Sequence, residues 1–308
     1  MILVCGGSAN PVVNSLCRQL NDHGYSYRLL DLAIYPNDFR VHSTWNGTNP
    51  DGYIANASWK LNLEDLSAVF LRYPAMEERI RPEHLEPRIA SVRAECDAAL
   101  GVLLDSLPCP VVNRPRASFS TRSKPFQALH IRRCGLFTPR TLVTTDPDEA
   151  RQFYEECGKQ VIFKSISRVP SIVRMMDVED LERLPLLRHG PTQFQEFVPG
   201  TNIRVHTVGD EWIATRIHSK AVDYRYSGPD RHSVEMEPTT LPSDVAAACL
   251  RVARQLRLVF SGIDLKETPR GDYYCFEVNS SPAFDYYEQR SGQLIGALLA
   301  RFLHKGLR

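Results

Sequence analysis

The sequence lacks the features that would place the protein in a membrane or on a nucleic acid. It has no apolar run long enough to span a bilayer, and the apolar part of its start, MILVCGGSAN, is too short for a signal peptide. Its 37 basic and 36 acidic side chains leave a formal net charge of +1, which gives no basic field for nucleic acid. We therefore expect a cytoplasmic protein with neither a membrane nor a nucleic-acid partner.

A paired-cysteine motif is also absent. The eight cysteines are scattered along the chain, and no two of them form a C-x-x-C pair. A zinc ribbon or a thioredoxin-like redox centre is therefore not expected. Free thiols in a reducing cytoplasm account for all eight.

What the sequence does contain is 308 residues, 43% of them hydrophobic, enough for two or three compact lobes. Apolar runs at 2–5 and 27–32 predict strands, and Asn10 and Pro11 between them suit a helix N-cap and first turn. This strand–helix–strand order predicts an α/β domain with a parallel sheet. The intervening Gly6-Gly7-Ser8 does not fit the phosphate-loop pattern G-x-G-x-x-G, and we interpret it as a tight turn.

The most informative stretch is CFEVNSSPAF, residues 275–284. Its Glu277 and Asn279 lie two positions apart and so share one face of the predicted strand. A preceding strand, FSGIDLKE at 260–267, completes a predicted hairpin. The turn of this hairpin is centred near Pro269 and Arg270, so the residue numbers of a directly opposite pair should sum to about 539 or 541. Either sum places Asp264 on the same face as Glu277, at roughly 5–7 Å from it.

This acidic face predicts a metal site. Two carboxylates that close repel each other unless a cation or a proton intervenes, and an amide oxygen adds a neutral hard ligand. Three oxygen donors without histidine or cysteine suit Mg²⁺. The alternative is an exposed hairpin face with solvated acids, but the apolar neighbours Ile263, Phe276 and Val278 argue against it.

Charged residues elsewhere suit a nucleotide. Lys124 begins a predicted helix and Lys164 lies inside an apolar strand, where an ammonium group needs a partner such as a phosphate oxygen. The alternative for Lys164 is a side chain that extends to the surface. The predicted strand at 193–198 contains Glu196, and its backbone and the Glu196 carboxylate could contact an adenine edge and a ribose. Arg204 and Arg225 offer planar donors for phosphate or carboxylate.

The order of these residues resembles the ATP-grasp superfamily over roughly residues 110–308. The nearest groups in pattern are the RimK-type carboxylate–amine ligases and the graspetide (microviridin-type) peptide macrocyclases. The resembling stretches are NRP at 113–115, SK at 123–124, GLFTPRTLVT at 135–144, FKS at 163–165, QEFVPGTNIRV at 195–205, IHS at 217–219, DYR at 223–225, GIDLKETPRGDYYCFEVN at 262–279 and YYE at 286–288.

The resemblance implies a fold and a role for each residue. The fold is the two-lobed ATP-grasp of mixed α/β type, with an N-terminal Rossmann-like domain at 1–115, a small lobe at 116–190 and a C-terminal lobe at 191–308. The implied roles are Lys124 and Lys164 on the ATP phosphates, Glu196 and Val198 at the adenine hinge, Arg204 and Arg225 near the phosphates or the acceptor as catalytic residues, and Asp264, Glu277 and Asn279 on two Mg²⁺ ions.

The implied reaction is ATP- and Mg²⁺-dependent joining of a small-molecule or peptide carboxylate to an amine through an acyl phosphate, by an enzyme that is often oligomeric. The alternatives are a macrocyclase acting on a ribosomal peptide, a kinase, and a nucleotide-binding regulatory protein without catalysis. Two stretches depart from the family pattern. The lid region 165–184 contains no glycine, and Ser280 and Ser281 separate the metal asparagine from Pro282, which is less typical of a macrocyclase.

Overall fold

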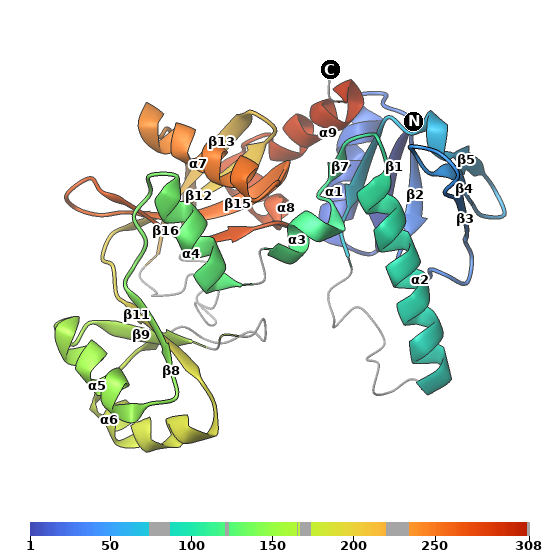
Figure 1. Cartoon of the computed structure of the whole chain (residues 1–308). Coiled ribbons are helices and arrows are strands. Elements are labelled where there is room, and N and C mark those ends of the chain that lie inside the picture. Colours follow the sequence, from blue (N-terminus) through green and yellow to red (C-terminus); the bar gives the residue numbers. More distant parts are fainter. Residues whose placement is uncertain (74–86, 121–122, 165, 167–173, 220–233, 307–308) are drawn as a thin grey trace.

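The computed structural model describes residues 1–73, 87–120, 123–164, 166, 174–219 and 234–306. It is a mixed α/β structure with a C-terminal sheet at its centre, an N-terminal domain on one side and a smaller lobe on the other (Figure 1). The predicted Arg225 and residues 165 and 167–173 of the predicted lid lie outside the described residues. In the described part, no helix is long and apolar enough to cross a membrane.

The N-terminal domain confirms the predicted parallel sheet. Its strand order is β2-β1-β6-β7. Asn10 caps α1 by accepting from the backbone N–H groups of Val12 and Val13, and Asp31 accepts from Ser8 N at 3.2 Å, which fixes the Gly-Gly-Ser segment as a turn. The elements are β1 (Ile2–Gly6), α1 (Pro11–Asp22), β2 (Tyr27–Asp31), β6 (Ala68–Leu71), α2 (Pro87–Ser106) and β7 (Val111–Val112), with a small antiparallel sheet of β3 (Arg40–Thr44), β4 (Asp51–Ala55) and β5 (Lys60–Asn62) beside them.

The smaller lobe is built on an antiparallel sheet in the order β10-β9-β11-β8. The strand predicted at 193–198, which we expected to open the C-terminal lobe, is β11, and it pairs with β8 and β9 and so belongs to this sheet. The division of the chain at residues 115 and 190 remains a prediction. The elements of this lobe are β8 (Thr141–Thr144), α5 (Pro147–Glu156), β9 (Val161–Lys164), β10 (Arg174–Met175), α6 (Val178–Arg183) and β11 (Thr192–Glu196). The helices that precede them in the chain, α3 (Pro115–Ser120) and α4 (Lys124–Arg133), contribute instead to the core of the C-terminal sheet.

The C-terminal sheet is antiparallel, in the order β14-β13-β12-β15-β16. One face packs on α7 and α4, and the other shares a core with α8, α9 and the N-terminal domain. The central sheet therefore has an apolar core on both sides. The elements are β12 (Thr201–Val208), β13 (Glu211–His218), β14 (Glu235–Thr239), α7 (Ser243–Gln255), β15 (Phe260–Glu267), β16 (Tyr273–Asn279), α8 (Phe284–Ser291) and α9 (Ile295–Lys305).

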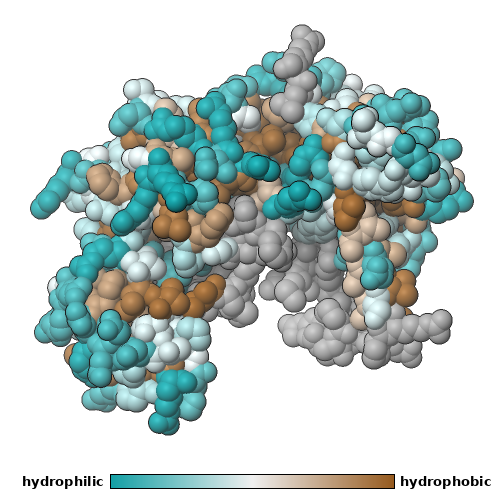
Figure 2. Space-filling view, in the orientation of Figure 1, coloured by the Kyte–Doolittle hydropathy of each residue, from teal (hydrophilic) through white to brown (hydrophobic). Residues whose placement is uncertain are grey.

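The visible surface is mostly hydrophilic (Figure 2). Hydrophobic residues on this face include a group over the region of β9 and β11, on the side of the smaller lobe that is turned toward the C-terminal sheet. An apolar surface between two lobes is the usual setting for a small-molecule site.

Candidate active site

The predicted acidic hairpin is present, and its side chains share one face. In the antiparallel pair of β15 and β16, Asp264 lies directly opposite Glu277, and Gly262 lies opposite Asn279. Residues directly opposite each other project from the same side of a sheet. Asp264, Glu277 and Asn279 are therefore neighbours, and all three are half-buried.

The register that brings these residues together depends on a β-bulge. Next to the turn, Leu265 pairs with Cys275, so positions there sum to 540, and the expected odd sum is wrong at that point. Phe276 is the extra residue, and beyond it the sum becomes 541. Because a slip of one residue turns side chains to the other face, an unbulged strand would point Glu277 and Asn279 toward the core.

Arg204 and Asn279 both contact the Asp264 carboxylate. Nη1 of Arg204 donates to Oδ1 of Asp264 at 2.5 Å, and Nδ2 of Asn279 donates to Oδ2 at 3.2 Å. Arg204 is only 5% exposed, and its guanidinium lies 5.3 Å from the ring centre of Tyr287. The structure thus brings the predicted catalytic arginine to the predicted metal face.

Gly262 is required by this arrangement. A Cβ atom at position 262 would lie 2.1 Å from Nη2 of Arg204, closer than any real contact. The glycine of the Gly-Ile-Asp stretch therefore leaves the space into which the guanidinium of Arg204 fits. This glycine is needed for close packing and not for its backbone conformation, because its φ angle is not in the left-handed region.

The donor set fits a hard divalent cation. Among the described residues, none forms an ion pair or hydrogen bond with the Glu277 carboxylate. The amide nitrogen of Asn279 is used on Asp264, which leaves its oxygen as the group that can accept or ligate. No group of three His, Cys, Asp or Glu side chains suited to a metal occurs in the described part of the chain. A metal site here rests on two carboxylates and one amide, as Mg²⁺ accepts.

The two predicted phosphate lysines come from different parts of the molecule. Lys164 ends β9, is half-buried, and donates from Nζ to Oε1 of Gln195 at 3.1 Å. Lys124 is the first residue of α4, whose N-cap is Ser123. Because α4 packs on β16 while β9 belongs to the smaller lobe, the two lysines are carried by different parts of the molecule. Their contact with phosphate remains a prediction.

The predicted hinge is well ordered by hydrogen bonds. Oε2 of Glu196 accepts from the backbone N–H of Arg140 at 3.1 Å, and the backbone N–H of Phe197 donates to Gln160 O at 2.9 Å. Val198 is 4% exposed. These contacts join the end of β11 to Arg140, directly before β8, and to Gln160, directly before β9. The roles of Glu196 and Val198 toward adenine and ribose remain predictions.

Lys266 is a site-facing residue that the sequence reasoning missed. It lies two positions after Asp264 on β15 and therefore on the same face. Its Nζ lies 5.4 Å from the ring centre of Phe197 and 5.6 Å from that of Phe276, and burial lowers the pKa of its ammonium. The period of two from Asp264 was the signal that could have identified it.

Side chains from the N-terminal part of the chain hold the segment Ser280-Ser281-Pro282, which directly follows β16. The Asn113 side chain accepts from the backbone N–H groups of Val259 and Phe260 and donates to the backbone oxygens of Phe260 and Ser280. Arg72, at the end of β6, donates to the backbone oxygen of Ser281 at 3.1 Å and to its Oγ at 3.0 Å. The N-terminal domain therefore holds the segment that follows Asn279.

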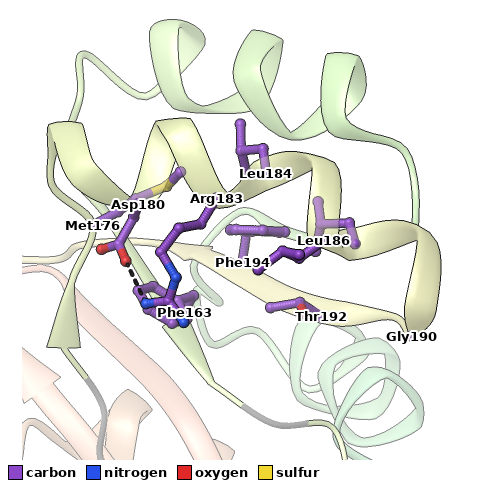
Figure 3. A pocket seen from close by; sticks show the side chains of 10 residues that line it. Phe163, Met176, Asp180, Arg183, Leu184, Leu186, Gly190, Thr192 and Phe194 are labelled. Carbon is purple, nitrogen blue, oxygen red and sulfur yellow. Dashed lines mark ion pairs between the residues drawn. The ribbon is translucent and has the colours of Figure 1, made fainter.

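A separate pocket of about 170 Å³ lies in the smaller lobe (Figure 3). Phe163 and Phe194 contribute to its wall, with the ion pair of Arg183 and Asp180 at 3.7 Å near its mouth. Lys164 follows Phe163 directly on β9, and successive strand residues point to opposite faces. This pocket is therefore on the opposite face of β9 from the side chain of Lys164.

Comparisons with known proteins agree with this geometry. A family model described as the RimK-like ATP-grasp domain matches residues 122–303. Beta-citrylglutamate synthase B of Danio rerio is 26% identical over 70% of this chain and 58% of its own length. A probable alpha-L-glutamate ligase of Shewanella loihica is 24% identical over 71% of this chain and 75% of its own. The chain thus spans less than two thirds of the length of the first of these relatives.

Solved structures match the chain over almost its whole length. The ATP-grasp ligase PsnB, complexed with a minimal precursor, Mg and ADP, is 26% identical with a TM-score of 0.82, covering 98% of this chain and 96% of that one. The macrocyclase MdnC of Microcystis aeruginosa, bound with the precursor peptide MdnA, is 21% identical with a TM-score of 0.83, covering 98% and 99%. The expected ATP-grasp fold is confirmed, and since the family model spans more than half of the sequence, the chain belongs to the RimK-like ATP-grasp family of ligases.

Proposed function

We propose that the protein is an ATP- and Mg²⁺-dependent ligase that joins a carboxylate to an amine through an acyl phosphate. The observation that carries the proposal is the single face on which Asp264, Glu277 and Asn279 meet, with Arg204 against Asp264. Such a face places oxygen ligands and a fixed positive charge where phosphate groups can be held.

The proposed reaction has two steps. A carboxylate oxygen of the acid substrate attacks the γ-phosphorus of ATP, the bond to the β–γ bridging oxygen breaks, and ADP leaves. The amine nitrogen then attacks the acyl carbon, the bond from that carbon to the phosphate oxygen breaks, and phosphate leaves as the amine loses a proton. The acyl phosphate is needed because a free carboxylate would have to expel oxide or hydroxide.

The chain's own residues would act chiefly by position and charge. Bound Mg²⁺ would supply positive charge beside the β- and γ-phosphates. Lys124 and Lys164 would bind phosphate oxygens from the two parts of the molecule that carry them, and Glu196 and Val198 would contact the ribose and the base. Arg204 would hold Asp264 in place and present its remaining donors toward the phosphates or the acid substrate.

A specific observation favours a second candidate, a peptide macrocyclase. The structural matches to PsnB and MdnC, both solved with a precursor, cover 96% and 99% of those chains, whereas the sequence matches to beta-citrylglutamate synthase B and the probable alpha-L-glutamate ligase cover 58% and 75% of theirs. A peptide carrying both an acidic and an amine or hydroxyl side chain would then be the substrate, and one molecule of water would be lost for each ring.

The nature of the ATP products tests the proposed route. We expect stoichiometric ADP and phosphate, because attack at the γ-phosphorus leaves ADP, and we expect hydroxylamine to trap the acyl phosphate as a hydroxamate when the amine is withheld. The measurement is ADP release and hydroxamate formation over a panel of amino acids, dipeptides and acidic peptides. ADP release with an acid but no trapped acyl group would favour a kinase, and AMP with pyrophosphate would contradict the mechanism.

A further inference from the structure

Gln127 is a buried amide, 1% exposed, that contacts β16, the strand that carries Glu277 and Asn279. Its Oε1 accepts from the backbone N–H of Val278 at 2.8 Å, and its Nε2 donates to the backbone oxygen of the same residue at 3.0 Å. Val278 stands between Glu277 and Asn279. A single side chain therefore satisfies both backbone groups of the residue that separates two of the candidate metal ligands.

The position of β16 explains why this contact is needed. β16 is the last strand of its sheet, so one of its two backbone edges has no neighbouring strand in the described part of the chain. On that edge, the N–H of Cys275 donates to the backbone oxygen of Phe137 at 2.8 Å, and Val278 is paired by Gln127. The bulged residue, Phe276, lies between these two points of attachment.

The two attachments therefore bracket the bulge. The register on the turn side of Phe276 and the register on the far side differ by one residue, and only the second turns Glu277 and Asn279 toward Asp264. Gln127 is attached on the far side, where it holds the strand in the shifted register. It also lies three residues after Lys124 on α4, so one helix carries both the predicted phosphate lysine and the attachment to β16.

We propose that Gln127 is a positioning residue for the metal site, which fixes the bulged register of β16 through the backbone of Val278. This inference rests on the proposed function, since it concerns the affinity of that site for Mg²⁺. Replacing a side chain that orients metal ligands through hydrogen bonds typically lowers metal affinity by about 10- to 100-fold.

The test compares two amides that bind the backbone of the same sheet. Gln127→Met keeps the length of the side chain and removes both hydrogen bonds to Val278, and Gln127→Glu keeps only the acceptor for its N–H. The matched control is Gln293→Met, because Gln293 donates to the backbone oxygen of Ala214 at 2.8 Å and accepts from Thr215 Oγ1, on the strand β13 that carries none of the metal ligands. Calorimetry with a non-hydrolysable ATP analogue, below the melting temperature of every variant, gives nucleotide affinity without and with Mg²⁺.

We expect Gln127→Met to weaken the Mg²⁺-dependent part of binding by about tenfold or more, with metal-free nucleotide affinity unchanged. The Mg²⁺-dependent part of binding in Gln127→Glu should lie between that of Gln127→Met and that of the parent, and in Gln293→Met it should equal that of the parent. Mg²⁺ affinity in Gln127→Met equal to that of Gln293→Met would overturn the proposal. If Gln127→Met does not fold, the same comparison with Gln127→Glu decides. A parent protein without any Mg²⁺-dependent binding would instead refute the proposed function.

Discussion

Replacing Glu277 with glutamine is expected to abolish most of the Mg²⁺-dependent binding of ATP and to reduce ADP formation at least about 100-fold. The substitution keeps the shape of the side chain and removes one of two carboxylates on the site face. A catalytic metal ion contributes several kcal/mol of charge stabilisation, and each 1.36 kcal/mol corresponds to about tenfold in rate. Calorimetry with and without Mg²⁺, together with the ADP release rate, measures both effects.

The same substitution makes an opposite prediction for stability. Glu277 lies directly opposite Asp264, and like charges at such positions destabilise a sheet. Without metal, Glu277→Gln should therefore melt at the same temperature as the parent or slightly higher. Glu237→Gln is the control, since Glu237 lies on β14 at the opposite edge of the sheet. Equal loss of metal binding in both variants, or a lower melting temperature for Glu277→Gln, would contradict the assignment.

The second large effect is expected at Lys164. Lys164→Met keeps the length and apolar stem of the side chain and removes the ammonium that now contacts Gln195. The loss of a charge-assisted hydrogen bond to phosphate should cost about 2–3 kcal/mol, or roughly 30- to 150-fold in ATP affinity or turnover. The measurement is ATP affinity together with the rate of ADP formation.

Lys159→Met is the matched control for this substitution. Lys159 is in the same lobe, its side chain is 64% exposed, and it faces Glu155 at 3.8 Å. Because an exposed ion pair contributes little, this variant should behave like the parent. Kinetics of Lys164→Met that match those of Lys159→Met would assign Lys164 to the alternative of a lysine that only extends to the surface.

The hairpin shows how far the sequence could predict the site. The period of two along FEVN predicted a shared face for Glu277 and Asn279, and the structure confirms it. The β-bulge at Phe276 was beyond local pattern, because it is held by Phe137 and by Gln127, which are far from β16 in the sequence. The predicted face was therefore correct although the predicted register next to the turn was not.

Assignments that depend on contacts between distant segments were harder to predict. The strand at 192–196 has the same composition whether it opens one lobe or completes another, and only its pairing with β8 and β9 decides. Asn113 is part of the stretch NRP in the sequence, and in the structure its side chain joins the end of β7 to the start of β15 and to Ser280, directly after β16. An amide that bonds only to backbone groups leaves no pattern in the residues it contacts, because any residue offers the same N–H and C=O.

The central claim is that Asp264, Glu277 and Asn279 form a Mg²⁺–nucleotide site, and a thermal-shift measurement on the parent protein tests it most directly. A ligand that binds only the folded state raises the melting temperature in proportion to RT ln(1 + [L]/Kd). We predict that a non-hydrolysable ATP analogue with Mg²⁺ raises the melting temperature more than the analogue or Mg²⁺ alone, and that Glu277→Gln loses this additional shift. No shift with the analogue and Mg²⁺ in the parent protein, or an equal additional shift in Glu277→Gln, would contradict the account.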